Sequence, residues 1–193
     1  MGRDKSRLRL GRRTMLGHIR PEARKLGLPV RVIRRDAVPR CGPLGGIHTA
    51  LQTTRADAVL FLACDMPFVT AELLSVLCNR FADHEHGLFV ETKGKSGFPF
   101  ILRQESRAIV SRQIGRGELS LGRLAAAAKA GAFLPKRAWQ SQLLNVNTPK
   151  EWEQAQRRLS LRTPANRRGL SWIAAGGARP CRRPAAALSI RCG

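Results

Sequence analysis

The sequence predicts an α/β fold in which a mostly parallel sheet carries helices on both faces. Residues 58–64 form a continuous apolar run of strand length, and a run without alternation is typical of a central parallel strand covered on both sides. Segments with strand patterns alternate along the chain with segments of helical periodicity, which favours an α/β sheet. The 193-residue chain is 43% apolar and 25% charged, the composition and length of one ordinary globular domain.

The first predicted strands enclose a glycine-rich loop. β-branched residues at 28–34 predict a short strand. Three glycines and two prolines at 39–46 predict a loop, and a helix is expected over 47–52. The apolar run at 58–64 ends abruptly at Asp65, so we expect the chain to leave the sheet there.

Two helices and two strands are predicted in the middle of the chain. Thr70 is the expected N-cap of a helix whose leucines and Phe81 lie on one face. Two strands at 87–91 and 98–102 are joined by a turn rich in lysine and glycine. Ser120 is expected to begin a further helix that runs through several alanines and ends at a glycine.

The predicted domain ends near residue 159. Residues 142–146 predict a last strand, and Thr148-Pro-Lys-Glu151 is a capping box with proline at the first helical position. Beyond this helix Arg, Ala, Pro and Gly dominate and no acidic residue occurs. We therefore expect 1–159 to be the folded domain and 160–193 to be a disordered basic tail. A translated stretch of non-functional sequence would have the same composition.

The net charge of +22 predicts an anionic partner, either nucleic acid or a phosphorylated small molecule. Aromatic residues make up only 5% of the chain and tyrosine is absent, which argues against a surface that stacks single-stranded bases.

No apolar run approaches the ~20 residues of a membrane-spanning helix, and the charged start does not resemble a signal peptide. Five cysteines without a C-x-x-C pair indicate a reducing, cytoplasmic location rather than a disulfide framework.

Two features could carry chemistry by their position alone. Asp65 follows a buried strand, and ligands of open α/β sheets bind beyond the carboxyl ends of strands, where a carboxylate can hold Mg²⁺. A strand-terminating aspartate that caps a turn would look the same. The glycine-rich segment before 47–52 could offer backbone N–H groups to a ligand, or it could simply turn the chain.

In this order, the segments resemble the molybdenum cofactor guanylyltransferase (MobA) family, within the nucleotidyltransferases of three-layer α/β/α, GT-A-like fold. The matching pieces, which together cover about residues 1–157, are Met1-Gly-Arg-Asp-Lys5, Asp36 with its following Gly-Pro-Leu-Gly-Gly, Ala63-Cys-Asp-Met-Pro-Phe68, Phe98-Pro-Phe100 and Asn145-Val-Asn-Thr-Pro149. The family has histidine where Phe98 stands. The combination is specific, although each piece alone is weak.

The resemblance implies Mg²⁺-dependent transfer of GMP from GTP to the molybdenum-molybdopterin cofactor, with release of pyrophosphate. It assigns Lys5 and Asp65 to catalysis, Asp65 also to Mg²⁺, and Asn145 and Asn147 to the acceptor side. The implied nucleotide-binding residues are Lys5, Asp36, Gly42, Pro43, Leu44, Gly45, Gly46 and Asp65. The expected partners are the two substrates and molybdoenzyme chaperones or other cofactor-biosynthesis proteins, and the expected state is a monomer without membrane association.

The sequence also departs from the family pattern. It begins inside the first motif, so the first strand and its Gly-Gly phosphate loop are expected to be missing, and the chain is expected to be an incomplete enzyme. An incorrect start site is the simplest cause. Transfer from CTP or another nucleotide is the alternative within the same class. The alternative from another class is a non-catalytic, basic nucleic-acid-binding protein, which the charge alone supports.

Overall fold

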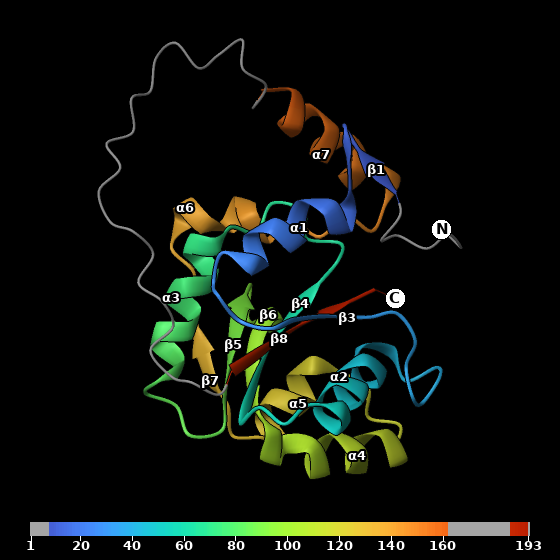
Figure 1. The fold of residues 1–193 in the computed structure, drawn as a ribbon, viewed down its shortest axis with the longest axis vertical. Helices are drawn as coiled ribbons and strands as arrows, with labels where there is room; N and C mark the ends of the chain where they lie inside the picture. The colour runs from blue at the N-terminus through green and yellow to red at the C-terminus, as the bar shows by residue number, and fades with distance from the viewer. Residues whose placement is uncertain (1–7, 162–185, 193) are drawn as a thin grey trace.

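The computed structural model describes residues 8–161 and 186–192, which form one main sheet, one small sheet and the helices around them (Figure 1). The strands are β1 (Arg9–Leu10), β2 (Arg13–Thr14), β3 (Val30–Ile33), β4 (Ala58–Ala63), β5 (Gly87–Thr92), β6 (Lys95–Arg103), β7 (Gly131–Phe133) and β8 (Ala186–Arg191). The α-helices are α1 (Met15–Arg24), α2 (Gly42–Thr53), α3 (Ala71–Phe81), α4 (Arg107–Gly115), α5 (Leu121–Ala127), α6 (Arg137–Gln140) and α7 (Pro149–Leu161). Short 3₁₀ turns are η2 (Gln104–Ser106) and η3 (Ser141–Leu143).

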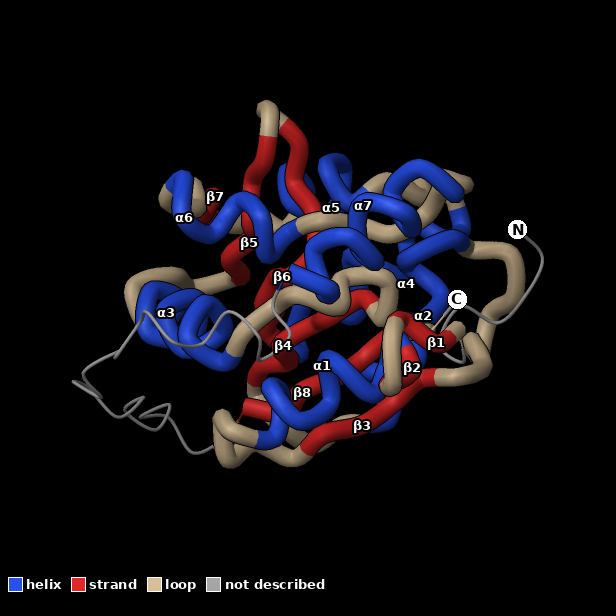
Figure 2. The backbone as a smooth tube through the Cα atoms, turned by 90° about the horizontal axis from the view of Figure 1, so that it is seen from above, coloured by secondary structure: helices blue, strands red, loops and turns tan. Residues whose placement is uncertain are grey.

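The main sheet has six strands in the order β3-β8-β4-β6-β5-β7. The pairs β3–β8, β8–β4 and β5–β7 are parallel, whereas β6 runs antiparallel to both β4 and β5. Figure 2 shows β3, β8 and β4 side by side at one end of this sheet. The predicted mostly parallel α/β sheet is therefore confirmed.

Helices cover both faces of the sheet, as the lack of alternation in β4 predicts. Helices α1 and α3 lie on one face, and α2, α4 and α5 lie on the other (Figure 1). Successive side chains of β4 alternate between the two apolar cores: Leu60 and Leu62 pack toward α1 and α3, whereas Val59 and Phe61 pack toward α2 and α4. Because side chains of a strand point alternately to opposite faces, a strand buried on both sides has to be apolar throughout.

Several predicted elements are confirmed with their caps. The Thr70 side chain accepts a hydrogen bond from the Leu73 amide at 3.4 Å, which begins α3. The capping box of α7 is formed in both directions: the Glu151 amide donates to the Thr148 hydroxyl at 3.2 Å, and the Thr148 amide donates to the Glu151 carboxylate at 2.8 Å. The hairpin between β5 and β6 turns at Lys93 and Gly94, both of which have positive φ.

Two local predictions are wrong. The predicted loop over 39–46 is helical from Gly42, because Pro43 lies in the first turn, where a missing N–H costs nothing. The predicted last strand at 142–146 is not a strand in the structure. Its first part belongs to the η3 turn, and the rest runs extended beside the Asp65 loop without joining the sheet.

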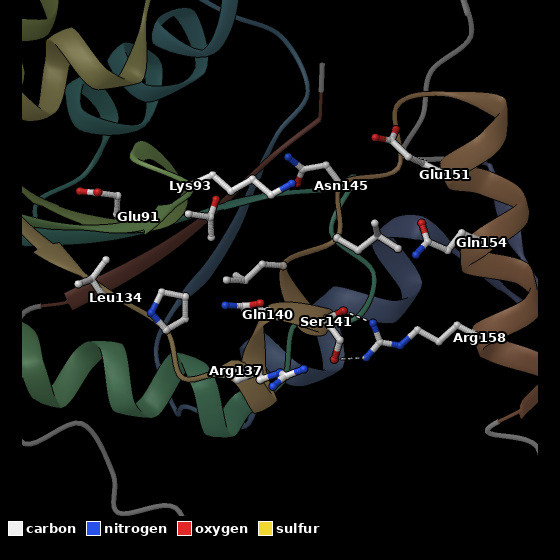
Figure 3. Close-up of a pocket in the computed structure, with 14 residues that line it drawn as sticks. Glu91, Lys93, Leu134, Arg137, Gln140, Ser141, Asn145, Glu151, Gln154 and Arg158 are labelled. Atoms are coloured by element: carbon white, nitrogen blue, oxygen red, sulfur yellow. Dashed lines mark hydrogen bonds between the residues drawn. The ribbon is translucent and has the colours of Figure 1, made fainter.

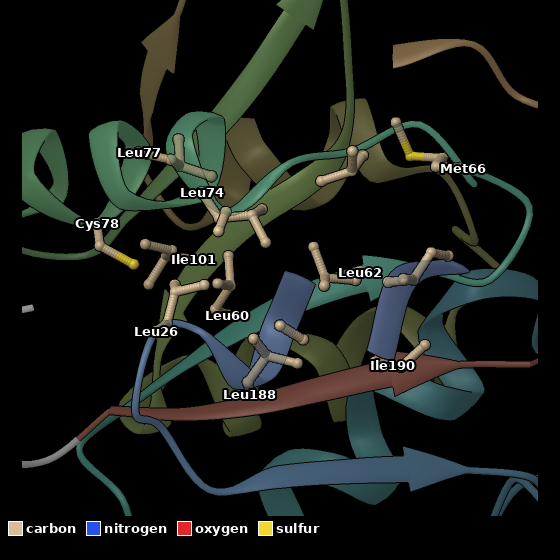
Figure 4. Close-up of a cluster of buried hydrophobic side chains, with 14 of the residues drawn as sticks. Leu26, Leu60, Leu62, Met66, Leu74, Leu77, Cys78, Ile101, Leu188 and Ile190 are labelled. Atoms are coloured by element: carbon tan, nitrogen blue, oxygen red, sulfur yellow. The ribbon is translucent and has the colours of Figure 1, made fainter. Parts of the chain in front are cut away.

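The predicted disordered tail is wrong for residues 186–191, which form β8 between β3 and β4. Leu188 and Ile190 are fully buried against the α1 and α3 core (Figure 4). This late segment therefore lies inside the main sheet, with a strand on each side of it. This strand was missed because its signal is short: only the last four residues of β8, Leu-Ser-Ile-Arg, alternate between apolar and polar, and they follow a region rich in Arg, Ala and Pro. The remaining residues of the expected tail up to 185 lie outside the described part, apart from the end of α7.

In the described residues, no helix is long and apolar enough to cross a membrane.

Candidate functional site

The ends of three neighbouring parallel strands place charged residues at one edge of the sheet. Arg191 closes β8 and lies in register with Ile33 of β3 and with Ala63 of β4. Asp36 follows β3 and Asp65 follows β4, so both carboxylates leave the sheet at the edge where β8 ends. This carboxyl edge is where open α/β sheets bind their ligands.

Asp36 and Arg191 form an ion pair on the first turn of α2. Arg191 Nη2 lies 3.1 Å from Asp36 Oδ2, and the two side chains are only 20% and 19% exposed. A Cβ atom on Gly45 would lie 2.6 Å from Asp36 Oδ2, and a Cβ on Gly46 would lie 2.5 Å from Arg191 Cδ. The two glycines are therefore required by the close approach of these two charged side chains.

The remaining residues of the glycine-rich segment shape the beginning of α2. Gly42 has a φ of +50°, a conformation that favours glycine, and it is exposed. Leu44 is fully buried in the core beneath the helix, while Pro43 is half-buried. The structure thus explains Gly45 and Gly46 by packing against charged groups, and it replaces the expected open loop by a helical turn.

Asp65 lies in the turn after β4, beside the two candidate asparagines. The Val146 amide donates to the Asp65 carbonyl at 2.8 Å. Val146 is buried, whereas Asn145 and Asn147 on either side of it are exposed, as alternation in an extended segment requires. The sequence-predicted acceptor residues are therefore brought next to the predicted metal residue.

A cleft of about 900 Å³ opens beside Asn145 (Figure 3). Its charged lining comes from the β5–β6 hairpin, α6 and α7, and consists of Glu91, Lys93, Arg137, Glu151 and Arg158. Arg158 is held in place by the Ser141 hydroxyl and carbonyl, which both accept hydrogen bonds from its guanidinium. Three cations against two carboxylates leave the lining with a small positive excess, so the cleft could take a polar, anionic ligand. Asn147 is not among the lining residues.

Sequence reasoning missed Arg191 and the charged residues that line the cleft, although it included Asn145. The pattern Leu-Ser-Ile before Arg191 alternates as a strand should, but the interpretation of the region as a tail rested on composition. The cleft is built from separate elements, and no local motif marks it. Lys5 lies outside the described residues, so its implied role stays a prediction.

One solved structure and one curated sequence resemble this chain over most of its length. The crystal structure of molybdopterin-guanine dinucleotide biosynthesis protein A from Archaeoglobus fulgidus is similar with a TM-score of 0.67, at 18% identity over 83% of this chain and 92% of that one. A "Probable molybdenum cofactor guanylyltransferase" from Carboxydothermus hydrogenoformans is 28% identical over 181 residues, which are 84% of this chain and 91% of the relative. The structural likeness confirms the predicted nucleotidyltransferase fold.

More similar sequences match over shorter segments. The molybdenum cofactor guanylyltransferase of Acinetobacter baumannii strain ACICU is 30% identical over 95 residues, 48% of this chain and 46% of that protein. This match spans less than half of the relative's length. The model of the MobA-like NTP transferase domain family matches residues 1–130, most of the described N-terminal part and more than half of the chain. This chain belongs to the MobA-like NTP transferase domain family.

Proposed function

We propose that the chain transfers GMP from GTP to the molybdenum-molybdopterin cofactor and releases pyrophosphate. The observation that supports this proposal is the position of Asp65 at the carboxyl edge of the sheet, where Asp36 and Arg191 also lie at the ends of β3 and β8. The Asp65 carbonyl accepts a hydrogen bond from Val146, and the neighbouring Asn145 lines the cleft. A transfer reaction needs a donor nucleotide and an acceptor near one carboxylate, and these neighbours of Asp65 are the groups that we propose bind them. The names of the relatives supply the substrates.

The reaction is a displacement at phosphorus. An oxygen of the molybdopterin phosphate forms a bond to the α-phosphorus of GTP while the bond from that phosphorus to the β-phosphate bridging oxygen breaks, and pyrophosphate leaves with the electron pair. Catalysis of such a step consists mainly of positioning the two phosphates and neutralising their charge. In this proposal Asp36 and the start of α2 hold the nucleotide base, Asn145 and Asn147 hold the acceptor, and Lys5 approaches the phosphates.

The Asp65 carboxylate, which lies beyond the carboxyl end of β4, is a hard oxygen ligand of the kind that a divalent metal such as Mg²⁺ takes. MobA-like nucleotidyltransferases are generally dependent on such a metal. Within the described part of the chain, no group of three or more His, Cys, Asp or Glu side chains could hold a metal by itself. Mg²⁺ commonly uses one or two carboxylates and completes its shell with water and substrate phosphates. We propose that Asp65 holds Mg²⁺ in this way and that the ion supplies charge neutralisation.

Nucleotide choice is the direct test of the proposal. With molybdopterin as acceptor, the purified 193-residue chain is expected to release pyrophosphate from GTP and not from CTP at equal concentration. Excess unlabelled CTP or ATP should leave the GTP reaction unchanged in a competition assay. Preference for CTP would replace guanylyl by cytidylyl transfer. Turnover of GTP would contradict the expectation that this chain is an incomplete enzyme, and absence of turnover with every nucleotide would contradict the proposed function.

Asn145→Ala is expected to raise the KM for molybdopterin by about tenfold, the loss of one or two hydrogen bonds at ~1 kcal/mol each, while the KM for GTP stays unchanged. Asn145 lines the cleft and is exposed to a ligand there. Steady-state kinetics with each substrate varied in turn measures both constants. Asn79→Ala, at an exposed position of α3, is the matched control. An increased KM for GTP instead would place Asn145 on the nucleotide side.

We also propose a cytoplasmic location and monomeric state, with molybdoenzyme chaperones or other cofactor-biosynthesis proteins as recipients of the product. The cysteine pattern supports the location. The chemistry supports such recipients, because a completed cofactor has to be passed to the enzymes that use it.

A further inference from the structure

We propose that Arg191, carried by the C-terminal strand β8, is a positioning residue of the nucleotide site that holds the Asp36 carboxylate in place for the base. The inference rests on the proposed function, in which Asp36 contacts guanine. It adds a residue from the region whose composition alone predicted a disordered tail. The last strand of the chain then acts on substrate selection and not only on stability.

The backbone of Arg191 is held from both sides. Its carbonyl accepts the Cys64 amide at 2.9 Å, at the end of β4, and the next amide, of Cys192, donates to the Ile33 carbonyl at 3.1 Å. The alternation of β8 sends Leu188 and Ile190 into the core under α1 and α3. Arg191 consequently points to the opposite face, onto the first turn of α2. Its position is therefore set by the sheet register.

The side chain of Arg191 is confined as well. A Cβ atom on Gly46 would lie 2.9, 2.5 and 2.7 Å from the Cγ, Cδ and Nε atoms of Arg191, so the side chain fits only because residue 46 is glycine. Its Nη2 donates to Asp36 Oδ2 at 3.1 Å, and that oxygen in turn approaches Gly45. The guanidinium thus fixes one oxygen of Asp36 against the helix. A carboxylate held in this way has a defined direction for its remaining lone pairs.

One hydrogen-bond donor of the Arg191 side chain is unsatisfied, which would not be expected if the ion pair served stability alone. Arg191 Nε is buried and has no hydrogen-bond partner among the described residues. A buried donor without an acceptor costs stability, so packing alone gives no reason to keep an arginine here. An arginine is favoured instead where the orientation of a carboxylate matters, because its planar group directs several donors.

The fixed carboxylate suits guanine better than cytosine. Guanine presents two adjacent N–H donors on its pairing edge, and an ionised carboxylate accepts hydrogen bonds without donating any. Cytosine has one amino donor on that edge, with acceptors beside it, which a carboxylate would repel. If Arg191 keeps Asp36 in one orientation, removing the arginine should weaken GTP binding and reduce the discrimination against CTP.

A double-mutant cycle tests the inference by direct binding. GTP and CTP affinities of the full chain are measured by isothermal titration calorimetry with Mg²⁺ for wild type, Arg191→Gln, Asp36→Asn and the double variant. We expect each single variant to weaken GTP binding about tenfold, and the double variant to be no weaker than either one. The GTP-over-CTP ratio should fall in all three. Arg123→Gln removes the exposed Arg123–Glu118 pair and is the matched control, with unchanged affinity.

The possible failures are separable. If wild type binds no GTP, the proposed function fails. If wild type binds GTP and Arg191→Gln binds it equally well, this inference alone is overturned. A lower melting temperature of Arg191→Gln with unchanged affinity would also overturn it, because the arginine would then be structural only. Should that variant not fold, Gly46→Ala leaves the sequence of β8 unaltered and places a methyl group 2.5 Å from Arg191 Cδ, which forces the arginine side chain to shift. Gly46→Ala is expected to reduce the GTP-over-CTP ratio in the same direction, and an unchanged ratio would count against the inference.

Discussion

Asp65→Asn is expected to lower the rate of pyrophosphate release at least about 100-fold, the scale on which removal of one electrostatic group acts in an active site. Asparagine has the size of aspartate but lacks the negative charge that Mg²⁺ requires. The backbone contact between the Asp65 carbonyl and the Val146 amide does not involve the side chain, so the turn should keep its shape. The measurement is pyrophosphate release from GTP and molybdopterin at saturating Mg²⁺.

Asp57→Asn is the matched control for this prediction. Asp57 is exposed and directly precedes β4, at the end of the strand opposite to Asp65. The same chemical change there should leave turnover unchanged, because ligands bind beyond the carboxyl ends of the strands. Equal turnover by Asp65→Asn and wild type would show that Asp65 is not part of the mechanism. It would favour the alternative interpretation, in which Asp65 ends the strand and caps a turn.

Leu188→Ala is expected to lower the free energy of unfolding by about 2–5 kcal/mol, the usual cost of the lost burial and the remaining cavity. Leu188 is fully buried in β8, where it packs with Leu60 and Leu26 on the face covered by α1 and α3 (Figure 4). Because a domain is stabilised by only ~5–15 kcal/mol in total, this single change should be plainly visible. Urea unfolding followed by circular dichroism measures it.

The control for the β8 prediction is Leu161→Ala at the end of α7. Leu161 is 74% exposed, so the same truncation there should change the unfolding free energy by less than about 0.5 kcal/mol. Equal, small effects of the two substitutions would show that β8 does not occupy the middle of the sheet in solution. A large effect at Leu188 alone would establish that the folded domain needs its C-terminal segment.

Local patterns were sufficient wherever the deciding interactions are close in sequence. The cap at Thr70, the capping box from Thr148 to Glu151 and the Lys-Gly turn of the β5–β6 hairpin each involve residues no more than a few positions apart. The apolar run of β4 likewise predicted a strand covered on both faces. The prediction for the start of α2 was wrong because its glycines were interpreted as turn residues. In the structure Gly45 lies against Asp36, and Gly46 lies against Arg191, which is far away in the sequence.

The residues of the candidate site also fall into two groups: those that local motifs predict, and those that only the packing of distant segments brings together. Asp36, Asp65, Asn145 and Asn147 were found from motifs, and the structure places Asp65 beside the asparagines through one backbone hydrogen bond. Arg191 could not be placed from sequence, since its partner Asp36 lies 155 positions away. The cleft residues Lys93 and Arg158 are brought together only by packing of the β5–β6 hairpin and α7 around one opening.

By itself, the sequence determined the class of the fold, most strand and helix positions, the family resemblance and the carboxylates at the strand ends. Each of these depends on periodicity, capping or short motifs, which act over a few residues. Only the tertiary structure decided that β8 lies between β3 and β4 and brings Arg191 to Asp36. The physical reason is that pairing of parallel strands is non-local: it depends on which strand edges remain open after the rest of the chain has packed, and no short window of residues records that.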